Sequence, residues 1–209
     1  MGAQMTWSRV KVVIFDCDGV MFDSREANEA YYNSILARFG KSRMNAEQRA
    51  YVHTHTASQS VAYLFDGDPR AAEAEAFRQR MSYDPFIGRM KMEPHLRGFL
   101  EYLRPTYKRA VATNRSDTMG RVLEEHGLTD CFELIVSSLD VARPKPAADA
   151  LLKVLGHFNV SASEAVYIGD SDIDAMTAAA AHVPFVAYKN PALSADLHIT
   201  YFKEMEAYL

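Results

Sequence analysis

The sequence predicts an α/β fold in which a doubly wound parallel sheet carries an inserted all-helical domain. A short apolar run at residues 10–15 indicates a first buried strand. A long block at residues 24–90 shows apolar residues at helical spacing and no convincing strand pattern. Strand and helix patterns then alternate along the rest of the chain, as they do in parallel sheets. We therefore expect a core domain built from residues 1–23 and 91–209 and a helical domain built from residues 24–90.

The helical block divides at its turn-forming residues. The first expected helix ends at Gly40, a residue type common just after helices, and Asn45 is suited to cap the second. The segment Asp66-Gly67-Asp68-Pro69 stops the third. Residues 23–24 and 88–93 join the block to the rest of the chain and are the expected hinges. The expected helices span residues 27–39, 45–51, 58–65 and 70–81.

Past the helical block, the periodicity alternates between strand and helix. The helix patterns cover residues 94–103, 118–126, 147–155 and 172–181, and the strand patterns cover residues 109–112, 132–136, 165–168 and 185–187. Strands that are joined through helices pair in parallel, so these strands are expected to form one sheet with residues 10–15. A last helical turn is expected near the C-terminus.

Composition and charge exclude several classes of protein. A chain of 209 residues, with 48% hydrophobic and 24% charged residues, is long enough to bury the core of an ordinary globular domain. The net charge of -4 argues against a nucleic-acid partner, and no apolar run is long enough to span a membrane. Cys17 and Cys131 form no CxxC pair, so we expect reduced thiols and a cytoplasmic protein. The oligomeric state stays open.

Polar side chains gather where the expected strands end. Because open α/β sheets bind ligands at the carboxyl ends of their strands, we expect these side chains to share one crevice. Burying several carboxylates together is costly unless a cation or a reaction uses them, although the first acid pair taken alone is equally well explained as a strand exit without chemistry. The residues are Asp16, Asp18, Thr113, Asn114, Lys145, Asp170 and Asp174.

The order of these segments carries a resemblance. Together they resemble the four motifs of the haloacid dehalogenase-like hydrolase superfamily, over nearly the whole chain. The resemblance implies a Rossmann-like core and a mobile helical cap at residues 24–90, and phosphoglycolate phosphatase-like enzymes are the branch it indicates. The segments are Asp16-Cys17-Asp18-Gly19-Val20, Thr113-Asn114, Arg143-Pro144-Lys145-Pro146 and Gly169-Asp170-Ser171-Asp172-Ile173-Asp174.

The resemblance also implies a reaction and a cofactor. Asp16 is the implied nucleophile, which forms an aspartyl-phosphate, and Asp18 is the implied general acid and base. Mg²⁺ is the implied cofactor, with Asp16, the backbone carbonyl of Asp18 and Asp170 as ligands. Asp174 is expected to act through water or from behind these ligands. The substrate is then a small phosphorylated metabolite.

The remaining motif residues are expected to hold the phosphoryl group. The resemblance assigns this role to the Thr113 hydroxyl, the Asn114 backbone N–H and the Lys145 ammonium group. The Lys145–Pro146 bond is expected to be cis, because a cis bond costs little before proline. Asp172 is expected to cap the helix that follows.

Two residue groups lie outside the motifs. His53-Thr54-His55-Thr56 is interpreted as a polar turn that overhangs the site, where His53 and His55 contribute to substrate specificity. A zinc pair is a weaker interpretation, because no carboxylate or cysteine ligand is obvious beside it. Arg115 either contacts an acidic group of the substrate or is a surface arginine.

Alternative functions stay open. A β-phosphoglucomutase-like phosphomutase resembles the same pattern, but those mutases have a histidine where this chain has Asn28, and a Glu-Asp pair where it has Gly169-Asp170. A phospho-accepting regulatory domain also uses acids, a hydroxyl and a lysine on a doubly wound sheet. Its accepting aspartate does not follow the first strand. The carboxylate at Asp18 favours phosphate esters over carbon–halogen or carbon–phosphorus bonds.

Overall fold

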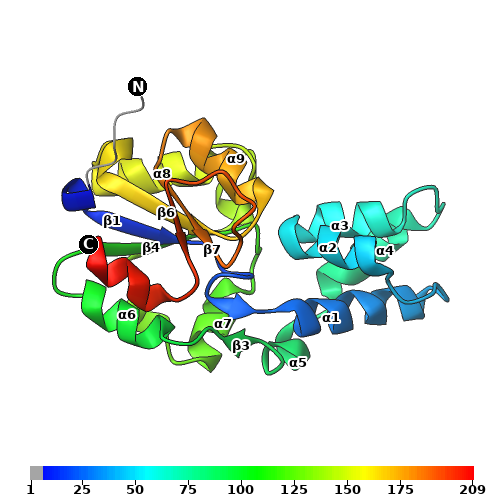
Figure 1. The fold of residues 1–209 in the computed structure, drawn as a ribbon. Coiled ribbons are helices and arrows are strands. Elements are labelled where there is room, and N and C mark those ends of the chain that lie inside the picture. The colour runs from blue at the N-terminus through cyan, green and yellow to red at the C-terminus, as the bar shows by residue number, and fades with distance from the viewer. Residues whose placement is uncertain (1–6) are drawn as a thin grey trace.

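The structure is a computed structural model that describes residues 7–209 (Figure 1). Within this range, a six-stranded sheet has the order β5-β4-β1-β6-β7-β8, and every neighbouring pair is parallel. The chain moves outward from β1 through β4 to β5 and then returns to the other side of β1 at β6. The predicted doubly wound sheet is therefore confirmed. The strands are β1 (Val12–Phe15), β4 (Lys108–Ala112), β5 (Leu134–Val136), β6 (Ala165–Gly169), β7 (Phe185–Tyr188) and β8 (Leu197–Ile199).

The central strand β1 is buried on both faces, because helices cover both sides of the sheet. Val13 and Phe15 belong to one hydrophobic cluster, whereas Val12 and Ile14 belong to the other. This division follows from the alternation of side chains along a strand. One cluster includes residues of α6 (Leu96–Leu103) and α7 (Met119–Glu125), and the other includes residues of α8 (Asp149–Phe158) and α9 (Asp172–Ala181).

The helices between the first two sheet strands form a separate group beside the sheet (Figure 1). They are α1 (Arg25–Arg38), α2 (Ala46–Thr54), α3 (Ala57–Leu64), α4 (Ala71–Arg80) and the short α5 (Asp84–Ile87). Asn45 caps α2 as predicted: its side chain accepts from the Gln48 N–H, and the Gln48 side chain accepts from the Asn45 N–H. The helix α5 was not predicted, because four residues show no period.

Two short strands join the helical group to the sheet. β2 (Phe22–Asp23) and β3 (Lys91–Met92) pair antiparallel, with Phe22 opposite Met92 and Asp23 opposite Lys91. The two chain segments that we expected to act as hinges therefore lie side by side as a ribbon. Their movement stays a prediction.

The structure corrects several local predictions. α2 continues to Thr54, one turn beyond the expected end, so His53 lies in a helix and not in a polar turn. Ser171, not Asp172, caps α9, because the Ser171 hydroxyl accepts from the Asp174 N–H. β8 was missed, because its three residues alternate around an exposed His198 and form no apolar run. The expected final turn is the 3-10 helix Phe202–Ala207.

Among residues 7–209, no helix has the length and apolar character required to cross a membrane.

Candidate active site

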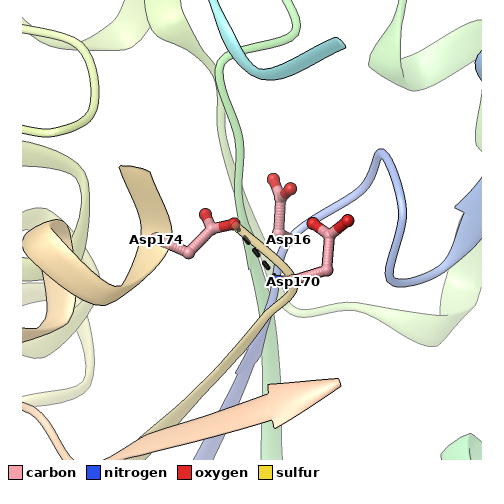
Figure 2. A group of neighbouring side chains, drawn as sticks. All are labelled: Asp16, Asp170 and Asp174. Atoms are coloured by element: carbon pink, nitrogen blue, oxygen red, sulfur yellow. Dashed lines mark hydrogen bonds between the residues drawn. The ribbon is translucent and has the colours of Figure 1, made fainter. Parts of the chain in front are cut away.

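The site lies where three neighbouring parallel strands end. Asp16 directly follows β1, Thr113 follows β4 and Asp170 follows β6. Since β1 pairs with β4 on one side and β6 on the other, these three residues meet at one edge of the sheet. Carboxylate oxygens of Asp16, Asp170 and Asp174 lie within 4.8 Å of one another, and Figure 2 shows Asp16 and Asp170 extending in the same direction. The tertiary fold thus gathers acids that are far apart in the sequence.

Glycines let the backbone approach this cluster closely. Gly19 has a φ of +84°, and a Cβ atom there would lie 2.0 Å from Oδ2 of Asp170. At Gly169, a Cβ atom would lie 2.3 Å from the Cβ of Asp174. Both distances are too short for any side chain, so the loop after β1 and the end of β6 require glycine to bring the carboxylates together.

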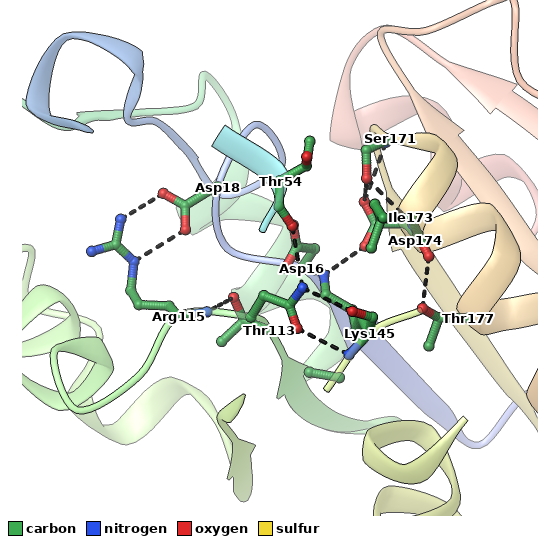
Figure 3. Close-up of polar contacts among 12 residues, drawn as sticks. Asp16, Asp18, Thr54, Thr113, Arg115, Lys145, Ser171, Ile173, Asp174 and Thr177 are labelled. Carbon is green, nitrogen blue, oxygen red and sulfur yellow. Dashed lines mark hydrogen bonds and ion pairs between the residues drawn. The ribbon is translucent and has the colours of Figure 1, made fainter. Parts of the chain in front are cut away.

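Lys145 is the cation at the centre of the cluster. Its Nζ donates to Oδ1 of Asp16 at 2.7 Å and to Oδ1 of Asp174 at 2.6 Å, as Figure 3 shows. Only 4% of the residue is exposed. Burial alone would lower the pKa of Lys145, but Asp16 and Asp174 outweigh burial and raise it above its ordinary value. Lys145 is therefore a charged residue of the site and not a solvated loop lysine.

Asp174 is saturated with hydrogen bonds. Besides Lys145, the Tyr167 hydroxyl donates to its Oδ1 at 2.7 Å and the Ser171 hydroxyl donates to its Oδ2 at 2.5 Å. These donors outweigh the effect of burial and hold the pKa of Asp174 below its ordinary value. Tyr167 is a residue of the site that the sequence pattern did not single out, although it is a hydroxyl-bearing residue in an otherwise apolar strand.

Asp170 differs from Asp174 in having no such partner. Among residues 7–209, no hydrogen bond or ion pair to its carboxylate is found. Burial, followed by the nearby charges of Asp174 and Asp16, raises the pKa of Asp170 to about 8. Burial and the neighbouring acids likewise raise the pKa of Asp16 to about 7, although Lys145 opposes this. An all-oxygen group with an excess of buried negative charge is a suitable site for a hard divalent cation. The residues present therefore fit a metal ion.

Asp18 is held by a charge pair rather than by this acidic cluster. Arg115 donates from Nη2 to its Oδ1 at 2.5 Å and from Nε to its Oδ2 at 3.1 Å (Figure 3), and the Ser24 hydroxyl also donates to Oδ1. Burial alone would raise the pKa of Asp18, but Arg115 outweighs it and holds the pKa below its ordinary value. Arg115 is 9% exposed, so the surface-arginine interpretation was wrong.

Thr113 and Asn114 occupy the loop after β4, beside Lys145. The Thr113 hydroxyl accepts from the Arg115 N–H at 3.2 Å. The Asn114 side chain has a function that the sequence did not indicate: it accepts from the Lys145 N–H at 3.0 Å and donates to the Lys145 carbonyl at 3.2 Å. This pair of bonds fixes the loop that carries the lysine. The Lys145–Pro146 bond is cis, as predicted.

The two histidines of the helical group lie in different surroundings. His53 is partly buried near Asp18, and its Nδ1 has no hydrogen-bond partner among residues 7–209. Loss of hydration lowers the pKa of its imidazole, although the charge of Asp18 opposes this. His55 stacks on Tyr51, with ring centroids 3.7 Å apart, and its Nδ1 lies 2.9 Å from the Tyr51 carbonyl. Neither belongs to the group of metal-type side chains found among residues 7–209. The zinc interpretation therefore finds no support there.

A cavity of about 90 Å³ lies between the strand ends and the helical group. Its wall includes the charged residues at the strand ends and also both histidines of the helical group. The side chain of Asn114 connects the two parts, because its Nδ2 donates to the Thr54 carbonyl at the end of α2, at 3.2 Å. The cavity residues from the sheet edge are Asp16, Asp18, Thr113, Asn114, Arg115, Lys145 and Asp170.

Comparisons with known proteins agree with this arrangement. The chain is 29% identical, over 93% of each chain, to the phosphoglycolate phosphatase of Rhodobacter capsulatus. It is 30% identical to the phosphoglycolate phosphatase of Rhodospirillum rubrum, over 84% of this chain and 78% of that protein. The crystal structure of a HAD-superfamily hydrolase of subfamily IA, variant 1, from Geobacter sulfurreducens is similar with a TM-score of 0.85 and 37% identity, over 96% of this chain and 100% of the other.

The profile of a whole protein family matches most of the sequence. It is that of the haloacid dehalogenase-like hydrolases, and it covers residues 13–188, a range that runs from β1 to β7 and includes every strand-end residue described above. With this match, the fold and the relatives in agreement, the chain belongs to the haloacid dehalogenase-like hydrolase family.

Proposed function

We propose that this chain is a Mg²⁺-dependent phosphatase that hydrolyses the monoester of a small phosphorylated metabolite through Asp16. The observation that supports it most is the convergence of Asp16, Lys145 and Asp170 at one edge of the sheet, beside Asp18. Phosphate esters react slowly because their charge repels nucleophiles, so a site needs both an attacking group and cations. This edge of the sheet offers a carboxylate and a buried lysine, together with acids that suit a metal.

In the first step, a carboxylate oxygen of Asp16 attacks phosphorus. The bond from phosphorus to the ester oxygen breaks, its electron pair stays on that oxygen, and Asp18 donates the proton that makes the free alcohol. Lys145 orients the Asp16 carboxylate through its bond of 2.7 Å. The Thr113 hydroxyl and the Asn114 N–H bind the phosphoryl oxygens.

In the second step, water hydrolyses the aspartyl-phosphate. Asp18, now a carboxylate, takes a proton from the water as the water oxygen attacks phosphorus, and the bond to the Asp16 oxygen breaks. Inorganic phosphate and free Asp16 are the products. Asp174 keeps Lys145 in place in both steps, because it shares the ammonium group with Asp16.

Asp16, the backbone carbonyl of Asp18 and Asp170 would hold the Mg²⁺ ion, and Asp174 would support it from behind. When bound, the ion supplies the positive charge that offsets repulsion between the Asp16 carboxylate and the phosphoryl oxygens. The unpartnered carboxylate of Asp170 supports this assignment, since a buried acid without a donor is unfavourable unless a cation neutralises it.

The helical residues 24–90 act in this proposal as a cap that selects the substrate. The strand-end residues recognise a phosphoryl group and a metal, which all phosphomonoesters share. Discrimination therefore depends on the cavity wall that the helical group contributes. Movement of the cap on the ribbon formed by β2 and β3 would admit the substrate and then exclude bulk water.

The phosphomutase alternative finds no favourable observation at its two distinguishing positions. Asn28 is 8% exposed and accepts a hydrogen bond of 2.7 Å from the Tyr83 hydroxyl. Gly169 has no space for a glutamate side chain, because its Cβ would collide with Asp174. Asn28 and Gly169 therefore both fit the packing of this chain, and neither position favours the mutase.

A panel of phosphomonoesters, assayed with and without Mg²⁺, tests the proposed function. We expect many turnovers of phosphate release with Mg²⁺ and none after exhaustive chelation. Phosphoglycolate is the first substrate to include, because relatives of this chain are phosphoglycolate phosphatases. Conversion of one sugar phosphate into its isomer without phosphate release would instead indicate the mutase. A single phosphorylation without turnover would indicate a regulatory domain.

A prediction separates the two histidines. Replacing His53 by alanine should change the relative kcat/KM values across this panel by about tenfold, because its partly buried ring lines the cavity and its Nδ1 has no hydrogen-bond partner among residues 7–209. Replacing His55 by alanine is the matched control and should change the ranking far less, because its ring is engaged with Tyr51. An unchanged substrate ranking in the His53 variant would remove this residue from the specificity element.

A further inference from the structure

The ion pair between Asp18 and Arg115 occupies the acid that the proposed reaction needs. Arg115 binds both carboxylate oxygens, at 2.5 Å and 3.1 Å, and the Ser24 hydroxyl adds a third donor. These three donors fill most of the acceptor positions of the carboxylate, and the guanidinium group of Arg115 covers both of its oxygens. Full access of Asp18 to the ester oxygen of a substrate therefore requires that the guanidinium group first turns to another partner.

Arg115 has further contacts that hold it at the cavity without Asp18. Its Nη1 donates to the Thr118 hydroxyl at 3.2 Å, and its Cζ lies 4.8 Å from the centre of the Tyr83 ring. Tyr83 precedes α5 in the helical group, and its hydroxyl donates to Asn28 of α1. The guanidinium group is thus anchored on both the core and the helical group, and it can leave Asp18 without leaving the cavity wall.

The other cations around the cavity are engaged in different ways. Lys145 binds Asp16 and Asp174. Arg78 pairs with Glu75 at 2.8 Å, and Arg121 pairs with Asp84 at 2.6 Å; neither of those acids has a part in the proposed reaction. Among the cavity cations in the part of the chain that the structure describes, Arg115 is the one paired with the acid that must be released.

We propose that Arg115 binds a carboxylate on the leaving group of the substrate and thereby frees Asp18 to act. A guanidinium fork binds any carboxylate in the same bidentate geometry, so the substrate carboxylate replaces that of Asp18 without loss of a charge pair. This inference rests on the proposed phosphatase function and narrows its substrates to monoesters of hydroxy acids.

The exchange makes substrate recognition and catalysis depend on one side chain. An ester whose leaving group lacks a carboxylate leaves Arg115 on Asp18, so its leaving oxygen gains no proton donor. Arg115 then selects substrates in the transition state as well as in binding, and its loss should lower kcat as well as raise KM.

The test compares phosphoglycolate with ethyl phosphate, which has the same chain length and no carboxylate. Arg115→Met should lower kcat/KM for phosphoglycolate by about 30-fold or more, the range expected for losing hydrogen bonds to a charged group. The same variant should hydrolyse ethyl phosphate at least as well as the unmodified protein, because Asp18 is no longer engaged. Arg121→Met is the matched control, and because its exposed pair contributes little, both substrates should stay within about threefold.

Equal losses on the two substrates would show that Arg115 only maintains the structure, and would overturn the inference, as would no loss on either. Should Arg115→Met fail to fold in a thermal melt, Arg115→Lys keeps the charge but not the fork, and the same difference between substrates is expected. Absence of phosphate release from every ester by the unmodified protein with Mg²⁺ would instead refute the proposed phosphatase function.

Discussion

Replacement of Asp16 by asparagine is expected to lower kcat by at least about 10⁴-fold, the loss typical of removing a catalytic nucleophile. The amide has nearly the shape of the carboxylate but is a poor nucleophile toward phosphorus. It still presents an oxygen to the Lys145 ammonium group, which lies 2.7 Å from the present carboxylate. The fold should therefore persist, and an unchanged far-UV circular dichroism spectrum with a cooperative thermal melt checks this.

Asp18→Asn is the informative comparison for this variant. An aryl phosphate has a leaving group that needs no proton donor, so Asp18→Asn should still form the aspartyl-phosphate but hydrolyse it slowly. The mass of the acid-quenched protein should then increase by one phosphoryl group in Asp18→Asn and not in Asp16→Asn. Phosphate release by Asp16→Asn within about tenfold of the unmodified protein would rule out Asp16 as the nucleophile.

Replacement of Asp170 by alanine should raise the Mg²⁺ concentration for half-maximal activity by about 100-fold or more, beyond the effect of altering a residue that merely supports a ligand. Asp170 follows the β6 strand and shares the strand-end edge with Asp16. Its carboxylate is the member of the cluster that has no hydrogen-bonding partner among residues 7–209. A Mg²⁺ titration of activity at saturating substrate measures the change.

Asp172→Ala provides the matched control for this variant. Asp172 is an exposed acid two residues away, at the start of α9, and lies outside the acidic cluster. Its loss should leave the Mg²⁺ requirement nearly unchanged. An Asp170→Ala protein with the same Mg²⁺ requirement as the Asp172→Ala protein would contradict the ligand assignment, as would full activity of the unmodified protein after exhaustive chelation.

The sequence predicts which residues lie at the site, but not all of the hydrogen bonds between them. The apolar run before Asp16 predicts a buried strand, and the acids at the ends of such strands predict a shared edge. The same logic placed Asp174 at this edge. It did not predict that the Tyr167 hydroxyl donates to Asp174, because the strand pattern presents Tyr167 as one more core residue. An aromatic residue at a core position gives no sign of where its hydroxyl points.

The helical group shows the same division. Its helices follow from apolar spacing and caps, and Asn45 was identified as a cap from its residue type. The reciprocal hydrogen bond with the Gln48 side chain is known only from the structure. The end of α2 was placed one turn early, because the polar run His53-Thr54-His55-Thr56 was interpreted as a turn, although the helix continues to Thr54. That error made His53 part of a turn, whereas it lies in the last turn of the helix, partly buried near Asp18.

The sequence by itself determined the doubly wound sheet, the order of the strand ends and the acids at them, because these depend on local periodicity and on chain direction. Only the tertiary structure decided the pairing of Arg115 with Asp18, which lie 97 positions apart, and of Asn114 with the Lys145 backbone, 31 positions apart. Contacts of this kind depend on loop paths and rotamers across separate strands, and they leave no periodic trace in the chain.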